Sequence, residues 1–415
     1  MESLSTTETA INKETPQLRF PEFDGKYENK KLKEIGKFIG GGTPKTDNDE
    51  FWNGDIPWIS SSDVYENDIH KIYISRYVNH SSIKHSATKK IPPQSILMVS
   101  RVGIGKFAVN EDTVTTSQDF TNLVTKNSNP YFLAYYFSAR SDKFLSLSQG
   151  TSIKGFTSKD AQNLSFKIPS LSEQQKIANF LTQVDRKIEL LDKQQTALEQ
   201  YKKGVMQKIF NQEIRFEIKN EAGELVKPPE WEEKKLGELI REKNEKTKTT
   251  DQHPLLSSTK RGIFNQNEYF KNQVASKNNT GYKILRKNEL VLSPQNLWLG
   301  NINLNFKYEL GIVSPSYKIF EINNSLTSAV FCSYFMFTPR MFHEYAEASE
   351  QGASVVRRNL DIDLFKSIKI KLPSIKEQTK IANFLSAIDT KIEAVAERSR
   401  SHREWKKGLL QKMFV

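Results

Sequence analysis

Three short stretches of the sequence carry residue types that could take part in catalysis. Residues 129–132 read N-P-Y-F, close to the N-P-P-Y/F loop of amino-methyltransferases, but the second proline is missing and no glycine-rich cofactor loop precedes them. Residues 103–106 read G-I-G-K and lack the G-x-x-x-x-G-K-S/T spacing that cradles a phosphate, so we expect a tight turn there. Glu22, Glu28 and Lys30 are spaced loosely like a nuclease carboxylate-lysine set, which charged chains often produce by chance. We therefore predict no catalytic residue in this chain.

Residue types that bind metals are equally sparse. The six histidines show no H-E-x-x-H or other ligand spacing. The single cysteine, Cys332, lies in the apolar run F-C-S-Y-F-M-F, where a core position is expected. One cysteine excludes an internal disulfide and a cysteine-rich metal site. We expect this chain itself to bind no metal and no cofactor.

The overall charge favours an anionic partner. A formal net charge of +12 and a pI near 9.3 are typical of proteins that bind a polyanion such as nucleic acid. The alternative is a protein-interaction scaffold whose basic charge is incidental. A hydrophobic content of 37% in 415 residues supplies cores for two or three domains. No apolar run is long enough to cross a bilayer, and the polar N-terminus carries no signal region, so we expect a cytoplasmic protein without a membrane partner.

The dominant feature of the sequence is a tandem duplication. Residues 168–210 occur again as residues 372–414, at a shift of 204 positions without a gap, and roughly half of the aligned positions are identical. Residues 27–35 match residues 231–239 at the same shift. The repeated unit is therefore a globular domain followed by a long segment. Between the matched ends, the two globular domains show little similarity, so one scaffold is expected to present two different surfaces.

Each long segment is predicted to form one helix. Ser170 and Glu173 have the S-x-x-E spacing of a helix start, and Ser374 and Glu377 repeat it. Apolar residues then recur every seven positions, which is typical of a helix that pairs with another, over roughly 55 to 60 Å at 1.5 Å per residue. Because the two copies can pair with each other, we expect an antiparallel coiled coil. Its predicted seam consists of Ile177, Leu181, Val184, Ile188 and Leu191 in the first copy and Ile381, Leu385, Ile388 and Ile392 in the second.

The helix ends are candidates for a partner surface, because lysines gather there. Lysines near a helix C-terminus also suit the helix dipole, and buried packing is the alternative for the two phenylalanines. The candidate partner residues are Lys202, Lys203, Gln207 and Phe210 in the first copy, and Lys406, Lys407, Gln411 and Phe414 in the second.

The rest of the chain indicates an α+β fold. Both globular domains are rich in short β-branched and aromatic runs separated by Gly, Pro, Asn and Asp, which is typical of strands and turns. The aromatic runs at 131–137 and 330–337 are interpreted as helices packed on a sheet. The predicted organisation is a flexible N-terminal tail (1–26), domain 1 (27–167), a central helical spacer (168–210), a linker (211–230), domain 2 (231–371) and a C-terminal helical spacer (372–415).

Several motifs together resemble one known family over nearly the whole chain. They are G-G-T-P at 41–44, F-W-N-G-D-I-P-W at 51–58, Q-G-T-S and Q-G-A-S at 149–152 and 351–354, and the repeated I/L-P-S-x-x-E-Q-x-K-I-A-N-F-L. The chain resembles the specificity subunit of type I restriction-modification systems. The resemblance implies a pseudo-two-fold repeat with two mixed α+β target recognition domains separated by an antiparallel two-helix spacer.

The resemblance also implies function and partners. The expected function is to bind a bipartite double-stranded DNA target and to recruit two modification (methyltransferase) subunits and two restriction (ATP-driven endonuclease) subunits. S-adenosylmethionine, ATP and Mg²⁺ would belong to those partners. The alternatives are a specificity subunit of a related restriction or methylation system, a coiled-coil scaffold that binds no DNA, and a nuclease or methylase in its own right.

Residues that contact DNA are expected among polar or basic side chains on Gly-, Pro- and Ser-rich loops. Arginines are favoured because they can pair with guanine in two places or hold a phosphate, whereas Ser and Asn often only cap turns. The candidates are Lys45, Thr46, Ser60, Ser61, Ser62, Arg101, Lys106, Ser117 and Gln118 in domain 1, and Ser257, Ser258, Lys260, Arg261, Gln295, Asn296, Ser314, Ser316, Arg357 and Arg358 in domain 2.

Overall fold

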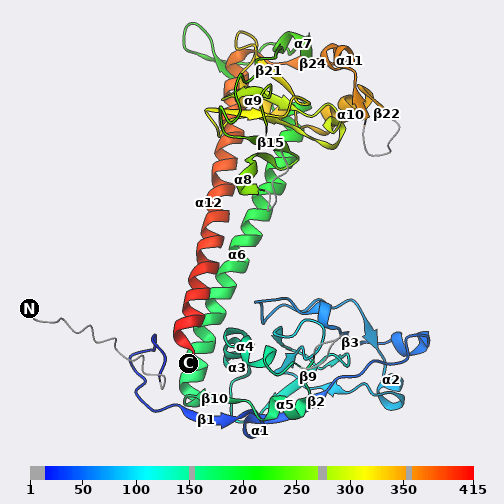
Figure 1. The fold of residues 1–415 in the computed structure, drawn as a ribbon, viewed down its shortest axis with the longest axis vertical. Coiled ribbons are helices and arrows are strands. Elements are labelled where there is room, and N and C mark those ends of the chain that lie inside the picture. Colours follow the sequence, from blue (N-terminus) through cyan, green and yellow to red (C-terminus); the bar gives the residue numbers. More distant parts are fainter. Residues whose placement is uncertain (1–14, 149–154, 270–277, 352–357) are drawn as a thin grey trace, which may run out of the picture. The chain divides into compact units, whose positions relative to one another are not determined.

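The computed structural model describes residues 15–148, 155–269, 278–351 and 358–415 (Figure 1). The chain divides into two compact units. Unit 1 contains the residues up to Lys193 together with Ala396–Val415, and unit 2 is Gln194–Val395. Helix α6 (Leu171–Phe210) and helix α12 (Ile375–Met413) each contribute one part to each unit. The two long helices predicted from the heptad pattern are thus confirmed.

Serine side chains begin both long helices as predicted. The Oγ of Ser170 accepts a hydrogen bond from Glu173 N at 3.3 Å, and the Oγ of Ser374 accepts one from Glu377 N at 3.4 Å. The two glutamates do not complete a capping box. Their carboxylates instead accept hydrogen bonds from Arg19 and Arg215, which arrive from other segments of the chain.

Within each unit, the parts of α6 and α12 run antiparallel. In unit 1, Asp185 pairs with Lys406, and Asp192 accepts a hydrogen bond from Ser399, so positions rise on one helix as they fall on the other. In unit 2, Asp389 pairs with Lys202 in the same manner. The seam residues lie in the cores as expected, with Ile177, Leu181, Val184, Ile188, Leu191, Ile381, Leu385 and Ile388 buried and Ile392 partly buried.

The two domains share a central sheet that their sequences do not reveal. Domain 1 has strand order β2-β9-β6-β7, and domain 2 has β14-β21-β18-β19, antiparallel throughout. Matched strands therefore occupy matched places. The bounds are β2 Gly36–Gly40, β6 Ser95–Met98, β7 Phe107–Val109 and β9 Thr121–Thr125, and β14 Ile240–Lys243, β18 Leu290–Leu292, β19 Ile302–Leu304 and β21 Lys318–Ile322.

A second matched element closes each domain. Strand β1 pairs antiparallel with β10, the strand just before α6, and β13 pairs likewise with β24, the strand just before α12. Each domain thus returns to its starting strand before its long helix begins. The bounds are β1 Glu28–Lys31, α1 Leu32–Ile35, α5 Ser158–Gln162 and β10 Ser165–Ile168, and β13 Glu232–Lys235, α7 Leu236–Leu239, α11 Ile362–Ser367 and β24 Lys369–Leu372.

The remaining strands form a second layer of matching order in each domain, with different connections. Domain 1 has a second four-stranded sheet of order β4-β3-β8-β5, in which β3 and β8 are parallel. In domain 2 the hairpin β15-β16 and the pair β17-β20 follow the same order, because the parallel bridge between Leu255 and Ile312 places β15 beside β20, and β22-β23 is a further pair. The bounds are η1 Asp49–Trp52, β3 Ile56–Ile59, η2 Ser61–Asp63, β4 Tyr77–Val78, α2 His80–His85, β5 Lys90–Ile91 and β8 Val114–Thr116, and β15 Leu256–Thr259, β16 Gly262–Asn265, α8 Gln266–Tyr269, β17 Lys283–Arg286, η3 Leu297–Leu299, β20 Leu310–Val313, β22 Ser349–Gln351 and β23 Arg358–Leu360.

The aromatic runs form helices in the cores, as predicted. Helices α3 (Pro130–Ala139) and α4 (Ser141–Leu145) belong to domain 1, and α9 (Ala329–Phe335) and α10 (Pro339–Glu347) belong to domain 2. Asn129 caps α3 by accepting a hydrogen bond from Phe132 N, and Pro130 begins it, so the N-P-Y-F stretch is a helix start. Cys332 is fully buried in α9, and burial raises the pKa of its thiol to about 12.

Part of the predicted N-terminal tail is ordered, which corrects the expectation of a flexible segment over 1–26. Leu18 N donates to Lys412 O at the end of α12, and Arg19 forms an ion pair with the buried Glu173. The tail prediction is wrong for this stretch because a polar sequence can be fixed by a buried charge pair. Residues 1–14 lie outside the described part of the chain.

The segment after α6 repeats these contacts in unit 2. Ile214 N donates to Lys208 O, and Arg215 pairs with Glu377, so this segment is held against α6 and α12 as the N-terminal segment is held in unit 1. A short hairpin of β11 (Ile218–Lys219) and β12 (Leu225–Val226) is inserted before domain 2. Across the described ranges, no helix has both the length and the apolar character needed to span a membrane.

Candidate nucleic-acid interface

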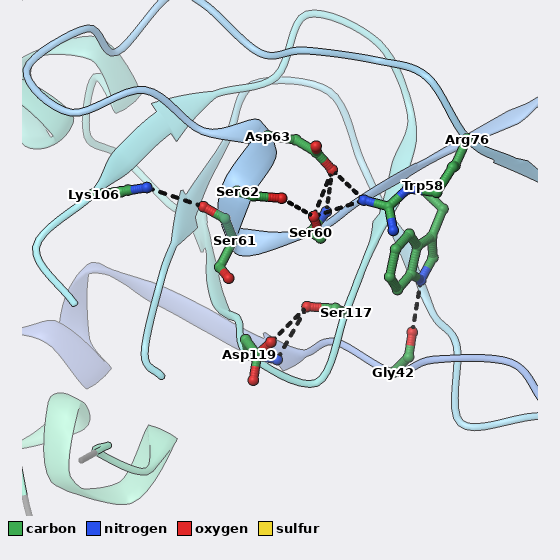
Figure 2. Close-up of polar contacts among 10 residues, drawn as sticks. All are labelled: Gly42, Trp58, Ser60, Ser61, Ser62, Asp63, Arg76, Lys106, Ser117 and Asp119. Atoms are coloured by element: carbon green, nitrogen blue, oxygen red, sulfur yellow. Dashed lines mark hydrogen bonds and ion pairs between the residues drawn. The ribbon is translucent and has the colours of Figure 1, made fainter. Parts of the chain in front are cut away.

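The parallel strands β3 and β8 bring two groups of predicted residues together in domain 1. Ser60, Ser61 and Ser62 follow β3, and Ser117 follows β8, so both loops lie at the same end of the strand pair. Figure 2 shows these serines converging with Lys106, whose Nζ donates to Ser61 O at 3.3 Å. The structure thus gathers five of the nine predicted residues of domain 1 in one place.

Within this cluster, Ser60 and Asp63 hold an arginine that sequence reasoning missed. Arg76 Nη2 lies 2.7 Å from both Ser60 Oγ and Asp63 Oδ2, and its guanidinium lies over the Trp58 ring at 4.5 Å (Figure 2). Asp63 is buried, while the Arg76 side chain is 42% exposed. A guanidinium fixed by a carboxylate and an indole presents its remaining N–H groups to a ligand in one orientation.

The feature of the sequence that points toward Arg76 is its aromatic partner Trp58, and not a Gly-, Pro- or Ser-rich loop. Trp58 lies in the F-W-N-G-D-I-P-W motif, and its backbone N–H donates a hydrogen bond to Arg76 O at 2.9 Å. Its indole N–H donates to Gly42 O at 3.1 Å (Figure 2). The G-G-T-P stretch and the F-W-N-G-D-I-P-W stretch are therefore joined by a hydrogen bond.

The remaining domain 1 candidates are exposed, namely Lys45, Thr46, Gln118 and Arg101. Arg101 precedes the positive-φ residues Gly103 (103°) and Gly105 (97°), which confirms a tight turn at G-I-G-K. Within the serine cluster, Ser117 is buried, and its hydroxyl donates to Asp119 Oδ2 at 3.4 Å.

In domain 2, the predicted serines of β15 hydrogen-bond neighbouring side chains. Ser258 Oγ donates to Asn301 Oδ1 and accepts from Asn303 Nδ2, both at 2.8 Å, and Ser257 Oγ accepts from Gln266 Nε2 at 2.7 Å. Both serines are buried. The sequence predicts a loop for Ser257 and Ser258, but both lie in strand β15, where their hydroxyls satisfy a buried amide network.

A small pocket lies beside this network. It has a volume of about 340 Å³ and is lined by Ser258, Lys260 and Asn296, together with Thr259, Leu299 and Asn301. Lys260 and Arg261 are exposed in the turn between β15 and β16. The structure thus brings three of the domain 2 candidates to one pocket, and a fourth candidate, Arg261, follows Lys260 in the sequence.

Domain 2 repeats the arginine–tryptophan arrangement with different residues. The Arg358 guanidinium lies over the Trp298 ring at 4.6 Å, and Arg358 N donates to Gln295 O. The predicted residues Ser314 and Ser316 hydrogen-bond each other after β20. Arg357 and the Q-G-T-S and Q-G-A-S stretches, apart from Gln351, lie outside the described residues. Within the described ranges, no group of three or more His, Cys, Asp or Glu residues could hold a metal ion.

A family comparison decides what kind of protein carries these two domains. The family model described as "Type I restriction modification DNA specificity domain" matches residues 25–200 and again residues 228–400. The chain belongs to this family. It is a specificity subunit of the type I restriction-modification class, as its sequence motifs indicate.

Relatives of this specificity subunit agree with that placement. It is 36% identical over 231 residues to the MjaIX specificity subunit of Methanocaldococcus jannaschii, covering 52% of each chain, and 32% identical over 190 residues to the EcoR124I/EcoR124II specificity subunit of Escherichia coli, covering 41% of this chain and 46% of that one. The matches thus span about half the length of these curated relatives. The crystal structure of an S subunit from M. genitalium, 15% identical, superposes with a TM-score of 0.56 over 97% of this chain and 99% of that one, which shows a shared fold.

The predicted partner residues at the helix ends have unlike surroundings in the specificity subunit. Lys406 is buried against Asp185, and Phe414 is buried and stacked on Tyr136 at 4.9 Å and 18°. Those two residues serve the fold of unit 1. Four of the predicted partner residues are exposed, namely Lys203, Gln207, Lys407 and Gln411, whereas Lys202 and Phe210 are partly buried.

Each unit fixes its helix pair to its domain through one lysine, one aspartate and one tyrosine. Tyr135 Oη donates to Asp185 Oδ2 at 2.6 Å, and Lys406 Nζ lies 2.6 Å from Oδ1. In unit 2, Tyr334 and Lys202 contact Asp389 at 2.9 and 2.5 Å. Burial and the neighbouring carboxylate raise the pKa of both phenols, that of Tyr334 to about 12, so they stay hydrogen-bond donors at neutral pH.

Proposed function

We propose that this specificity subunit reads a bipartite double-stranded DNA target, one half through domain 1 and the other through domain 2. The observation that carries the proposal is that one frame, including the sheets β2-β9-β6-β7 and β14-β21-β18-β19, supports two dissimilar polar loop clusters. A shared frame with unlike loops suits two different short sequences, because base edges are read by side chains and not by the scaffold.

The chain acts without catalysis of its own. It recruits two methyltransferase subunits and two restriction subunits, and S-adenosylmethionine, ATP and Mg²⁺ are bound by those partners in the cytoplasm. The net charge of +12 supports contact with DNA phosphates, so affinity for duplex should fall steeply as salt rises. Turnover of DNA by the purified chain alone, with all cofactors supplied, would contradict this proposal.

The direct test is single-molecule methylome sequencing of a host that expresses the chain with its methyltransferase subunit. We expect one methylated motif made of two short specified parts separated by unspecified base pairs. A host that expresses the methyltransferase subunit without this chain is the control and should lack the motif. A single continuous motif, or no new motif, would count against two reading domains.

Arg76 provides a sharper test of which domain reads which half. Arg76→Ala removes an oriented guanidinium, and we expect target affinity to fall by about 1 to 3 kcal/mol, with relaxed specificity in one half of the motif only. Arg358→Ala is the matched variant in domain 2, expected to affect the other half. The measurement is fluorescence anisotropy of the complex with methyltransferase on duplexes altered in either half. Loss of the same half in both variants would contradict the assignment.

A further inference from the structure

The lysine, aspartate and tyrosine of each unit lie at repeat-related places but differ in exposure. In unit 1 the Lys406 and Asp185 side chains are 11% and 16% exposed. In unit 2 the equivalent Lys202 and Asp389 side chains are 23% and 35% exposed. The same three-residue contact is therefore covered in one unit and open in the other.

A loop of domain 1 provides the cover in unit 1. We call residues 65–71 the covering loop. Its Asn67 carbonyl accepts a hydrogen bond from Lys406 Nζ at 3.3 Å, its Ile69 is buried in the core, and its His70 lies 2.8 Å from Tyr135 Oη and stacks on Tyr131. The loop thus offers an aliphatic side chain, a ring and a carbonyl, and it carries Glu66 and Asp68.

In unit 2 the repeat-related place is a large pocket. Its volume is about 1200 Å³, and Lys202, Tyr334 and Asp389 lie in its wall. Val330, at the position equivalent to Tyr131, also lines it and is 40% exposed. In the described part of unit 2, only the turn at residues 260–261 joins β15 to β16, where the covering loop lies between β3 and β4 in unit 1, so no such loop completes the contact among these residues. Apolar side chains face the pocket.

The pocket wall favours a protein segment that carries both apolar and acidic residues. Its apolar residues include Met206, Trp231 and Phe337, which suit an aliphatic or aromatic side chain and not a sugar-phosphate backbone. Basic residues outnumber acidic ones around it, because Lys202, Lys203, Arg340 and Lys371 face only Glu199 and Asp389. This charge complements the carboxylates of an acidic loop.

We propose that this pocket is a docking site for a loop of the methyltransferase subunit, one with an aliphatic side chain flanked by carboxylates. The identity of the partner rests on the proposed function, in which the methyltransferase must act on the DNA that domain 2 holds. The aliphatic side chain follows from Ile69 of the covering loop, which fills the equivalent place in unit 1, and the carboxylates follow from the excess of basic residues around the pocket. The methyltransferase therefore has a docking pocket on unit 2 that unit 1 does not offer at the equivalent place.

Ser333 allows the pocket to be filled without touching the three-residue contact. It lines the pocket from α9, and its hydroxyl donates only back to Val330 O among the contacts of the described residues. Ser333→Trp places an indole in the pocket, and we expect affinity for the purified methyltransferase subunit to fall at least about tenfold. Ser333→Ala, which leaves the pocket open, should bind as the unaltered chain does.

Two further experiments act as controls. A charge variant tests the pocket without disturbing the fold, and a cross-link identifies the molecule that occupies it. Lys203→Glu changes an exposed side chain of the wall and should weaken methyltransferase binding without altering the melting curve. A photoreactive phenylalanine at position 333 should cross-link to the methyltransferase subunit in the assembled complex. A cross-link to the restriction subunit, to a second copy of this chain or to DNA, or no cross-link, would overturn the proposal.

The two proposals fail in different ways. If the unaltered chain binds no methyltransferase subunit, the proposed function itself is wrong. If the unaltered chain binds it and Ser333→Trp and Lys203→Glu bind equally well, the function stands and the docking pocket is wrong.

Discussion

In unit 1 the carboxylate of Glu173 accepts hydrogen bonds from Arg19 Nε and Nη2 and from Tyr27, and in unit 2 Glu377 accepts them from Arg215 and Trp231. Around these contacts, the second sheet of domain 1 and the strands β16-β15-β20-β17 of domain 2 share their order, but 17 residues (60–76) separate β3 from β4 where two residues (260–261) separate β15 from β16. Both units therefore keep the ion pairs and the strand order, while the connections between the strands vary. We call the central sheets and the ion pairs of Glu173 and Glu377 the frame. Because these contacts fix the frame, the loops on each domain can differ in sequence and length.

The largest expected effect comes from removing the frame carboxylates. Glu173→Ala or Glu377→Ala leaves a mostly buried arginine unpaired, so the free energy of unfolding of the affected unit should fall by about 3 to 5 kcal/mol. Urea unfolding followed by tryptophan fluorescence measures it. Similar losses in both variants would support equivalent frames.

An exposed pair supplies the control for this experiment. Glu189 pairs with Lys193 on the surface of α6, and Glu189→Ala should leave the urea midpoint unchanged because exposed pairs contribute little. A large loss in only one of the two frame variants would show that the units are not held by the same contact.

The next largest effect should separate the two helix ends. Phe414 is 3% exposed and packs on Phe132 and Tyr136, so Phe414→Ala should lower the free energy of unfolding by about 3 to 4 kcal/mol. Phe210 is only partly buried and borders the pocket of unit 2, so Phe210→Ala should cost less than half as much. The same urea measurement applies, and equal losses would contradict the difference between the ends.

Long-range regularity is what made the frame predictable from the sequence. The heptads and the shift of 204 positions identify α6 and α12, because a helix face repeats along the chain. The ion pairs of Arg19 and Arg215 are not predictable from the repeat. The hairpin β11-β12 lies between Arg215 and Trp231 and has no counterpart between Arg19 and Tyr27, so the two arginines are not related by the shift of 204 positions. A buried charge pair between distant segments leaves no local pattern.

The candidate site was harder to predict than the frame. Ser258 looks like a turn residue in sequence, yet it lies in β15 and hydrogen-bonds Asn301 and Asn303. Arg76 lies outside the Gly-, Pro- and Ser-rich stretches and was not selected, although the fold places it on Trp58. Which polar residue faces solvent is decided by strand pairing, and the strands outside the central sheets are short and recur in the two domains without similar sequences.

The smallest effect should appear only in unit 1, where the covering loop carries His70. Burial lowers the pKa of His70 below its usual 6.5, outweighing the opposing effects of Asp185, Asp68 and Glu111, while Lys406 adds to the lowering. The unfolded chain therefore binds a proton at a pH where folded unit 1 does not, so this contribution to stability is present above pH 6.5 and is lost as pH falls toward the folded pKa.

His70→Gln should remove that pH dependence, because an amide does not titrate in this range. Urea unfolding at several pH values between about 5 and 8 would compare His70→Gln with the unaltered chain, and the exposed His80→Gln variant should keep the original dependence. If His70→Gln keeps the full loss of stability at low pH, the covering loop is not the source of it. A loss of stability at low pH that depends on His70 would distinguish unit 1 from unit 2, where the equivalent contact of Lys202, Tyr334 and Asp389 lines the pocket.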